Sequence, residues 1–515
     1  MKRPKDILVI GGGIAGMAYA VRLATNGRLG DHRIRILTKA PVQESNSFAA
    51  QGGVAAVTSS QDSIEKHVAD TLMVGAGRAI PSVVSKIIPA GPACINELIG
   101  MGARFDTDDH GLLHLTNEGG HSHPRVVHHV DRTGAEIVRV LLARVKALGI
   151  EIIPWQRAID LITIQDREVQ CCIGVRTLDL QTGISVDRPA SMVVLATGGL
   201  GQIYRHTTNP PAATGDGIAM ALRAGVQVRD MAFMQFHPTA LFTGEEGTVH
   251  LISEAVRGAG AILRDRNAIP FMRNEHPMAD LAPRNVVARA IHRKMNEEGS
   301  RHVWLDASGS GAVEFERRFP AIARVCADQG IIAGRDPIPV MPAAHYLCGG
   351  ILTDDRGRTC VEGLLALGEC AATGLHGADR LASNSLLEAL VVPRRAADMV
   401  PIPCGHIRRT GPMEVIVGTS PGRSDFSILR SRLRHIMSEH LGILRTRPGM
   451  AIARKEIGSI REELAERWDR GPIDRQLIEL RDLGAVAWAI ADGAWHEPAS
   501  IGTHCVDEFP IVPVD

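Results

Sequence analysis

The sequence has few aromatic residues, no excess of either charge and no long apolar run. Aromatic residues make up 3% of its 515 residues, and 57 basic residues balance 57 acidic ones. This balance argues against the basic footprint of a nucleic-acid-binding protein or of a protein that binds anionic membranes. The apolar run from Ile7 to Ile10 is too short for a signal sequence or a membrane span. We therefore expect a cytoplasmic protein with no nucleic-acid or membrane partner.

Cysteine patterns typical of metal sites are also missing. The nine cysteines form no C-x-x-C pair, and the neighbours Cys171 and Cys172 cannot easily bridge. A zinc site built from histidines has to be considered, since six of them lie near Glu118: His110, His114, His121, His123, His128 and His129. Glycines interrupt this segment, and no third ligand recurs at a helical or hairpin spacing. We expect reduced thiols and no metal site.

The N-terminal segment has the pattern of a dinucleotide-binding βαβ unit. A buried strand at 7–10 precedes Gly11–Gly16, a helix is expected through residue 24, and a second strand follows at 34–37. In G-x-G-x-x-G, the glycines allow a tight turn and let the backbone approach a pyrophosphate at the helix N-terminus. The second strand ends in Thr38-Lys39 and lacks the usual acid for an NAD ribose. The bound cofactor could therefore be a dinucleotide other than NAD.

The chain is long enough for two or three domains. We expect an α/β fold with a Rossmann-like dinucleotide-binding domain formed by residues 1–235 and 343–405. The strand–glycine-turn pattern stops between 236 and 342, which indicates an inserted α+β capping domain of helices and loops. There Glu254 and Arg257 are three residues apart and are expected to pair on one helix face. A Pro/Gly-rich linker at 401–422 leads to a C-terminal helical domain at 415–515, with an irregular tail from residue 500.

One stretch, LGECAATGLHGADRLASNSLLEAL at 367–390, combines several functional groups. It holds Glu369, Arg380 and a helix expected to begin at Ser383-Asn384-Ser385, residues that favour an N-cap. A helix N-terminus favours an anion or an electron-rich ring edge, and the arginine fork can bind a carboxylate. Taken alone, Ser383-Asn384-Ser385 would indicate only an ordinary capped helix after a loop. Asp216 also has two possible roles, which do not exclude each other: it could cap a helix or bind a cofactor hydroxyl.

Together, the motifs resemble the flavoprotein family of succinate dehydrogenase, fumarate reductase and L-aspartate oxidase, and within it most closely the L-aspartate oxidases. They occur in the family's order across residues 5–395: IGGGIAG, SNSFAAQGGVAAV, NEGGHSHPRVVHH, LATGGLGQIY, NPPAATGDGIAMALRAG, MQFHPTAL, LISEAVRG, APRNVVARAI, PAAHYLCGGI and GLHGADRLASNSLLEALV.

The resemblance implies FAD as the cofactor of the first domain. The residues that it assigns to FAD binding are Gly11, Gly12, Gly13, Ile14, Ala15, Gly16, Lys39, Asn46, Ser47, Phe48, Ala49, Ala50, Gln51, Gly52, Gly53, Asp216, Glu369, Ser385 and Leu386. Succinate dehydrogenases attach FAD through a histidine at the position of Asn46. We therefore expect non-covalent FAD.

The resemblance also implies a C4 dicarboxylate substrate, which needs cationic groups and donors at both ends. The residues similar to the family's substrate ligands are Glu118, Gln235, His237, Ser253, His345, Arg380 and Ser383. Arg284 resembles the family's proton donor or acceptor, and Glu254 and Arg257 resemble the relay that supplies it. A carboxylate at Glu118 resembles the acid that meets an α-ammonium group, which favours an amino dicarboxylate.

The implied reaction is oxidation of L-aspartate to iminosuccinate, with hydride transfer to flavin N5. Reoxidation would use O2, giving hydrogen peroxide, or fumarate. The product would feed quinolinate synthesis at the start of NAD biosynthesis, with functional coupling to quinolinate synthase. Two alternatives stay open: a soluble fumarate reductase and a flavin-binding partner protein without catalysis.

The sequence departs from the family pattern at three places. Ala259 replaces an acid near the expected relay, and Val392-Pro393 replaces a phenylalanine–glycine pair. Residues 500–505 lack an expected arginine and aromatic residue. We expect these changes to affect turnover and C-terminal packing more than the fold.

Overall fold

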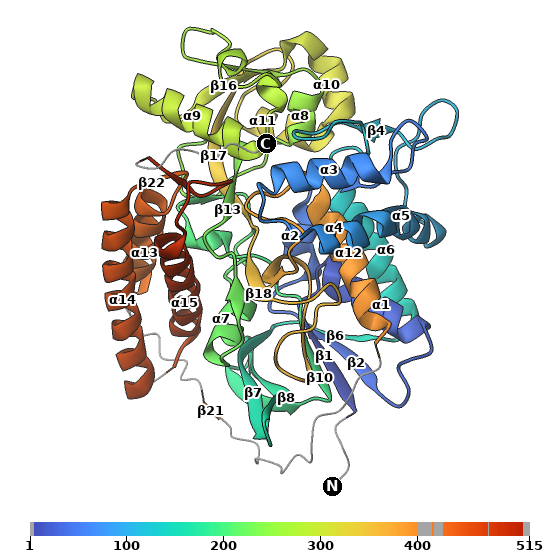
Figure 1. Ribbon diagram of the computed structural model, residues 1–515, viewed down its shortest axis with the longest axis vertical. Coiled ribbons are helices and arrows are strands. Elements are labelled where there is room, and N and C mark those ends of the chain that lie inside the picture. The colour runs from blue at the N-terminus through green and yellow to red at the C-terminus, as the bar shows by residue number, and fades with distance from the viewer. Residues whose placement is uncertain (1–4, 400–414, 417–425, 472, 508–515) are drawn as a thin grey trace.

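The fold is organised around a five-stranded parallel sheet with the order β19-β10-β1-β2-β6 (Figure 1). The computed structural model describes residues 5–399, 415–416, 426–471 and 473–507. The strands of this sheet are β1 (Asp6–Ile10), β2 (Arg33–Leu37), β6 (Glu151–Ile153), β10 (Met192–Leu195) and β19 (Leu364–Ala366).

Both faces of this sheet are covered, which explains the unbroken apolar strand at 7–10. Ile7 and Val9 belong to one buried core, shared with the helices α1 (Ile14–Thr25), α6 (Thr133–Ala147) and α12 (Asn384–Ala397). Leu8 and Ile10 belong to the core on the other face. Successive side chains of a strand point to opposite faces, so a strand between two cores is apolar throughout. The predicted strands at 7–10 and 34–37 are confirmed as β1 and β2, and the predicted helix through residue 24 is confirmed as α1.

Further elements surround the sheet. The region 62–100 is helical and is interrupted near Gly75–Gly77; its helices are α3 (Ile64–Val74), α4 (Pro81–Ile87) and α5 (Gly91–Gly100). Short elements on this side are α2 (Asn46–Ala49), β3 (Val54–Ala55), β4 (Leu115–Thr116) and β5 (Val126–Val127). An antiparallel sheet that the sequence analysis did not predict contains β7 (Gln156–Asp166), β8 (Val169–Asp179), β9 (Ile184–Pro189) and β21 (Val415–Ile416). A three-stranded sheet contains β12 (Val228–Arg229), β18 (Gly350–Leu352) and β20 (Ala371–Ala372), and α7 (Asp216–Arg223) packs nearby.

A six-stranded sheet extends through the capping region, with β16 near the top of Figure 1 and β13 closer to the middle. Its strands are β11 (His206–Thr207), β13 (Met234–Leu241), β14 (Gly247–Thr248), β15 (Ile262–Arg264), β16 (Val303–Asp306) and β17 (Ile338–Leu347). The helices of the capping region are α8 (Glu254–Gly258), α9 (Arg284–Glu298), α10 (Ala312–Arg318) and α11 (Pro320–Asp328). Short 3-10 helices occur along the chain at η1 (Val42–Glu44), η2 (Ile88–Ala90), η3 (Gly201–Ile203), η4 (Met272–Asn274), η5 (Ala279–Leu281), η6 (Ser308–Ser310) and η7 (Gly368–Cys370).

The α+β class expected for 236–342 is confirmed, but the sequence pattern indicated only helices and loops there and missed the two longest strands of this sheet, which begin and end the region. β13 contains Pro238 and has register shifts on both sides of His237 where it pairs with β17. Proline and β-bulges interrupt the regular alternation that identifies a strand in a sequence. Both strands cross the expected limits at 236 and 342, and the three-domain division remains our proposal.

The predicted C-terminal helical bundle is confirmed as α13 (Phe426–His440), α14 (Arg447–Arg470) and α15 (Arg475–His496). β22 (Leu444–Arg445) pairs with β23 (Cys505–Val506), so the segment from residue 500 is more ordered than expected. The remainder of the predicted irregular tail, residues 508–515, lies outside the described residues, as does the predicted linker at 401–422 apart from β21. Among helices in the described part of the chain, none has the length and apolarity to cross a membrane.

A buried ion-pair network joins the bundle to the sheet. Asp482 of α15 is fully buried and accepts hydrogen bonds of 2.8 Å from Arg157 of β7 and Arg223 of α7. Glu479, one turn earlier on α15, also contacts Arg157. Breaking a buried pair leaves an uncompensated charge, which destabilises strongly. The bundle is thereby fixed against the elements that carry Asp216.

We predict that Asp482→Asn lowers the unfolding free energy by about 3 kcal/mol, because the buried Arg157 and the half-buried Arg223 each lose one carboxylate partner. The measurement is the thermal unfolding midpoint at neutral pH. The matched control is Asp469→Asn, which changes an exposed aspartate of α14 and should leave the midpoint close to that of the wild type. Equal midpoints for both variants would contradict the structural role of Asp482.

Candidate active site

A single elongated cavity runs from the carboxyl ends of the parallel strands to the capping region. Residues from the sequence-predicted cofactor set line its lower part: Gly11, Gly12, Gly13, Ala15, Lys39, Asn46, Ser47, Ala49, Ala50, Gln51, Gly52, Gly53, Asp216, Glu369, Ser385 and Leu386. Residues from the predicted substrate and catalytic sets line its upper part: Glu118, His237, Ser253, Glu254, Arg284, His345, Arg380 and Ser383. The cavity therefore unites the two predicted sites.

Five residues of the predicted sets do not line the cavity. Ile14 and Phe48 pack in or against the core beside α1, and Gly16 packs against the Gly11 carbonyl, where a Cβ would come within 2.2 Å. Gln235 and Arg257 are buried behind the cavity wall and contact residues that line it. The predicted roles of these five residues at the site stay predictions.

The lower part has the features of a dinucleotide cradle. Gly11 has φ +117°, and a Cβ there would lie 2.0 Å from the Ala196 carbonyl, so the turn after β1 requires glycine. Buried oxygens of Asn46, Gln51 and Thr197, all from residues that line the cavity, have no hydrogen-bond partner in the structure. Buried polar groups are normally hydrogen-bonded, so these atoms fit a large polar ligand such as FAD.

Lys39 and Asp216 form a buried ion pair at one end of this cradle. The Lys39 ammonium lies 2.7 Å from the Asp216 carboxylate and donates to the Thr214 hydroxyl at 2.6 Å. Burial would raise the pKa of Asp216, but the charges of Lys39 and Arg157 lower this pKa to about 2. The N-cap of α7 is Gly215 and not Asp216, so the capping interpretation of Asp216 is wrong. Its carboxylate is ionised and faces the cavity.

Glu369 lies deeper in the same cradle. Its carboxylate accepts hydrogen bonds from the Asn46 side chain at 3.1 Å and from the Leu347 amide at 3.3 Å. Burial raises the pKa of Glu369 to about 7. A Cβ at Gly199 would lie 2.2 Å from this carboxylate, so a larger side chain there would displace it.

The helix predicted to begin at Ser383-Asn384 is α12, but Ser383 does not cap it with its side chain. Ser383 has φ +61°, and its hydroxyl instead donates to the Glu118 carboxylate at 2.6 Å. The N-cap prediction therefore gave the correct start of the helix and the wrong role for the hydroxyl. The first turn of α12 brings Ser385 and Leu386 to the cavity.

Glu118 is almost fully buried where the two parts of the cavity meet. Burial and the nearby Glu254 raise its pKa, which Arg284 opposes. A Cβ at Gly52 would come within 2.9 Å of its carboxylate, so the cofactor loop passes close by. A carboxylate with few donors around it suits a positively charged partner.

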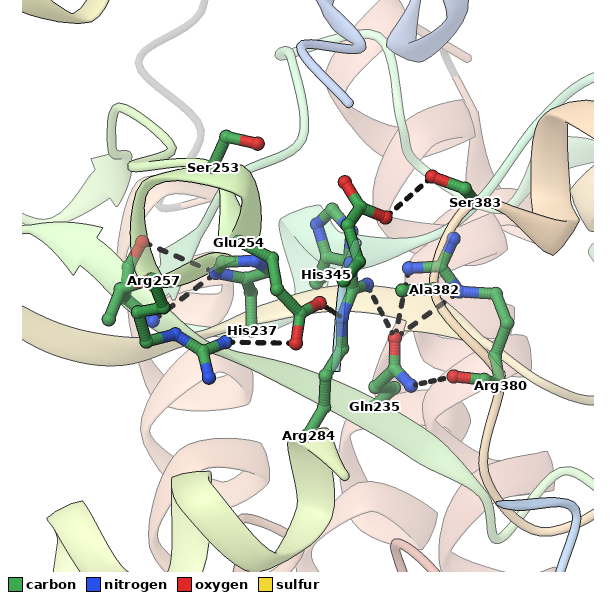
Figure 2. Close-up of polar contacts among 12 residues, drawn as sticks. Gln235, His237, Ser253, Glu254, Arg257, Arg284, His345, Arg380, Ala382 and Ser383 are labelled. Carbon is green, nitrogen blue, oxygen red and sulfur yellow. Dashed lines mark hydrogen bonds and ion pairs between the residues drawn. The ribbon is translucent and has the colours of Figure 1, made fainter. Parts of the chain in front are cut away.

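Three charged residues form a buried chain in the capping region (Figure 2). Glu254 accepts from Arg284 at 2.6 Å and from Arg257 at 3.1 Å, as expected for Glu254 and Arg257 on one helix face. Burial would raise the pKa of Glu254, but these two arginines lower it to about 2. Arg257 also donates to the Asp280 carbonyl, which anchors the end of the chain.

Gln235 holds two arginines together from behind the cavity wall. Its amide oxygen accepts from Arg284 at 3.1 Å and from Arg380 at 3.0 and 3.2 Å, as Figure 2 shows. Arg380 also lies over the Tyr346 ring, 4.3 Å from its centroid. Burial and the charge of Arg284 lower the pKa of Arg380 to about 10. Two cations therefore share a small buried volume that favours anionic groups.

The two predicted histidines lie in contact, with ring centroids 5.1 Å apart. Nδ1 of His237 lies 3.2 Å from both the amide and the carbonyl of Thr239, and its other ring nitrogen is Nε2. This Nε2 is buried without a partner. Burial and the surrounding arginines lower the pKa of both histidines well below the usual value. They are neutral hydrogen-bonding groups. Ser253 caps α8, accepting from the Ala255 amide at 3.3 Å.

Some residues of the site were missed by the sequence analysis. Thr197, Gly198, Gly199, Thr208 and Asn209 line the cavity, and Tyr346 and Asp379 contact its arginines or their partner Gln235. Strand β10 followed by a glycine turn was a usable signal for the first three. No local signal marked Asp379, because its contact with Gln235 joins distant parts of the chain.

The histidine-rich segment does not form a metal site within the described residues, where no group of three or more His, Cys, Asp or Glu side chains could hold an ion. His114 contacts His128 at 2.8 Å, and His123 contacts Lys66. His121 donates to the Ala382 carbonyl at 2.9 Å, beside Ser383. This last contact supports the loop that carries the hydroxyl bound to Glu118.

The chain is similar to known FAD-binding proteins over most of its length. The family model described as FAD binding domain matches residues 6–386. L-aspartate oxidase 1 of Ralstonia nicotianae is 42% identical over 524 residues, covering 98% of this chain and 95% of that protein. L-aspartate oxidase of Streptomyces coelicolor is 43% identical, covering 90% and 80%.

Solved structures show the same architecture. The flavoprotein FrdA of E. coli quinol fumarate reductase, in its E245Q form, has a TM-score of 0.88 at 28% identity and covers 100% of this chain and 93% of that one. Mycobacterium smegmatis Sdh1 has a TM-score of 0.80 at 29% identity, with 99% and 90% covered. These matches confirm the predicted fold class and the expected cofactor. The chain belongs to the L-aspartate oxidase family of FAD-binding flavoproteins.

Proposed function

We propose that this protein catalyses the FAD-dependent oxidation of L-aspartate to iminosuccinate, the first step of de novo NAD biosynthesis through quinolinate. The observation that carries the proposal is one cavity in which Arg284, Arg380 and the carboxylate of Glu118 converge beside a dinucleotide cradle. Two cations match the two carboxylates of the substrate, and one anion matches its ammonium group. The chemistry that FAD supplies when bound is acceptance of a hydride from the substrate Cα and its transfer to O2, giving hydrogen peroxide, or to fumarate.

In this proposal, binding and orientation of the substrate come from fixed side chains. Arg380 binds one carboxylate, helped by the neutral rings of His237 and His345, and Arg284 lies close to the second. The hydrogen bonds of Gln235 and Glu254 hold the two guanidinium groups in place before the substrate arrives. Orientation of this kind supplies a large part of the rate acceleration of enzymes.

We assign proton transfer to two groups in the upper part of the cavity. One is Glu118, and the other is Arg284 with its partners Glu254 and Arg257. The ammonium group of L-aspartate has to lose a proton before a hydride can leave Cα. Glu118 faces the space between the cofactor loop and the arginines, and its raised pKa suits it to accept that proton. Arg284, with Glu254 and Arg257 behind it, is the proposed proton donor or acceptor in the reverse direction, on an unsaturated dicarboxylate. Because Ala259 replaces an acid of the family pattern, Arg284, Glu254 and Arg257 lack one further carboxylate at this position.

A flavin bound without a covalent link is part of the proposal, and Asn46 carries it. The side chain of Asn46 lines the cavity and donates to Glu369, and an amide is no nucleophile toward a flavin methyl group. A location in the cytoplasm and functional coupling to a quinolinate synthase stay predictions from the sequence.

The direct test of the function is peroxide formation by the purified, FAD-loaded protein. We expect hydrogen peroxide with L-aspartate and none above background with succinate, because only the amino dicarboxylate pairs with Glu118. Reduced viologen with fumarate tests the reverse direction. A protein that reduces fumarate, oxidises succinate and ignores L-aspartate would be a fumarate reductase. A flavin that is reduced by none of these substrates would support a binding role without catalysis.

We predict that Glu118→Gln raises the KM for L-aspartate about 30-fold, because a hydrogen bond to a charged group contributes about 2 kcal/mol. The glutamine oxygen can still accept from Ser383, so the loop should keep its position. Inhibition by succinate, which has no ammonium group, should change much less. Glu245→Gln, an exposed change in the capping region, is the control. Equal losses for both ligands would reject the role of Glu118 in binding the ammonium group.

Acid precipitation tests the state of the flavin. We expect the yellow flavin to stay in the supernatant when the holoprotein is precipitated with trichloroacetic acid. The comparison sample is a covalent succinate dehydrogenase flavoprotein, whose pellet retains the flavin. A fluorescent pellet from this protein would show a covalent link and contradict the proposal.

A further inference from the structure

A buried carboxylate outside the predicted site determines how the key amide of the site is oriented. Asp379 is 1% exposed and accepts from the Gln235 amide nitrogen at 2.6 Å. The same nitrogen donates to the backbone carbonyl of Arg380 at 2.8 Å. With its nitrogen directed to these two acceptors, Gln235 has only its oxygen available for Arg284 and Arg380.

The opposite orientation of this amide would be strongly unfavourable. It would place an NH2 group between two guanidinium groups and leave five donors facing one another without an acceptor. The two arginines already repel, since the charge of Arg284 lowers the pKa of Arg380. The Gln235 oxygen is their shared acceptor, and Asp379 is the only side chain among the described contacts of Gln235 that fixes which end of the amide faces them.

Asp379 also contributes its own charge to the site. The groups that face it are Arg284, Arg289 and the Asn285 amide from α9, the Gln235 amide from β13 and the Cys348 thiol after β17. Burial raises the pKa of Asp379 to about 6, although Gln235 and Arg284 oppose the increase. An aspartate in this environment changes its protonation state near neutral pH.

We propose that Asp379 is a positioning residue that orients Gln235 toward the two substrate-binding arginines, and whose negative charge limits the affinity of the site for dicarboxylates. The proposal rests on the function argued above, because it takes a dicarboxylate as the ligand. A ligand with two negative charges beside Asp379 favours its neutral form. Binding is therefore linked to uptake of a proton at this residue.

The direction of the pH dependence follows from this linkage. The pKa of Asp379 is about 6 without ligand and higher with a dicarboxylate bound. Affinity is then greatest below pH 6, where the residue is neutral in both states. It falls as pH rises, until Asp379 is ionised in both states. A difference of one pKa unit corresponds to a change in Kd of about 10-fold.

The test is binding of succinate to the FAD-loaded protein, followed by the change in flavin absorbance between pH 5.5 and 8. We expect the wild-type Kd to rise about 10-fold across this range. In Asp379→Asn, the amide oxygen still accepts from Gln235 but the charge is gone, so the rise should be several-fold smaller. Glu118 and Glu369 also have raised pKa values, so the comparison between variant and wild type is the decisive quantity.

Two further variants separate orientation from charge. Asp379→Ala removes the acceptor of Gln235 and should weaken succinate at every pH, whereas Asn should restore tight binding. The matched control is Asp230→Asn, because burial also raises the pKa of Asp230 but it pairs with Arg229 and does not contact Gln235. This control should keep the wild-type pH dependence.

A second measurement counts the protons directly. Calorimetric titration of the wild-type holoprotein and of Asp379→Asn with succinate near pH 7, in phosphate and in Tris, gives the number of protons taken up on binding. We expect net uptake by the wild type and less uptake by Asp379→Asn, because Glu118 and Glu369 are present in both proteins. Zero uptake, or an unchanged pH profile in Asp379→Asn, would overturn the proposal. Neither readout requires turnover, so a negative peroxide assay would count against the proposed function alone.

Discussion

Two guanidinium groups, Arg284 and Arg380, lie in one buried site, and their mutual repulsion sets the requirements for the residues around them. Each is satisfied in a different way. Arg284 pairs with the ionised Glu254, while Arg380 lies over the Tyr346 ring and donates to Ser385. The oxygen of Gln235 serves both. These contacts leave the cations close together and only partly compensated, which is the condition for binding a doubly negative ligand.

The same requirement explains why the site lies between two parts of the fold. Arg284 begins α9 in the capping region, and Arg380 precedes α12 beside the parallel sheet. Gln235 lies on β13, the strand with which the capping region begins. Neither part contains both cations, so the repulsion between the two guanidinium groups arises only when the two parts pack together. The cavity becomes strongly cationic only where the two parts meet above the cofactor cradle.

Local patterns allowed much of this protein to be predicted, and long-range contacts account for the failures. The strand at 7–10, the glycine turn and the bundle follow from periodicity and turn chemistry, and the pairing of Glu254 with Arg257 follows from helical spacing. β13 and β17 were missed because Pro238 and register shifts disrupt the alternation. The role of the Ser383 hydroxyl was misassigned because it donates a hydrogen bond to Glu118, 265 residues away in sequence. The contact of Asp379 with Gln235 is equally remote and had no local signal.

The segment before residue 507 has a mechanical consequence for the cleft. The Gly502 carbonyl accepts from the side chain of Asn285, next to Arg284, at 2.9 Å. The neighbouring Thr503 donates through its amide and hydroxyl to the carbonyl of Ala378, next to Asp379. One dipeptide thus joins the segment that carries Arg284 to the segment that carries Asp379 and Arg380. Moving these two segments apart at this point has to break one of these attachments.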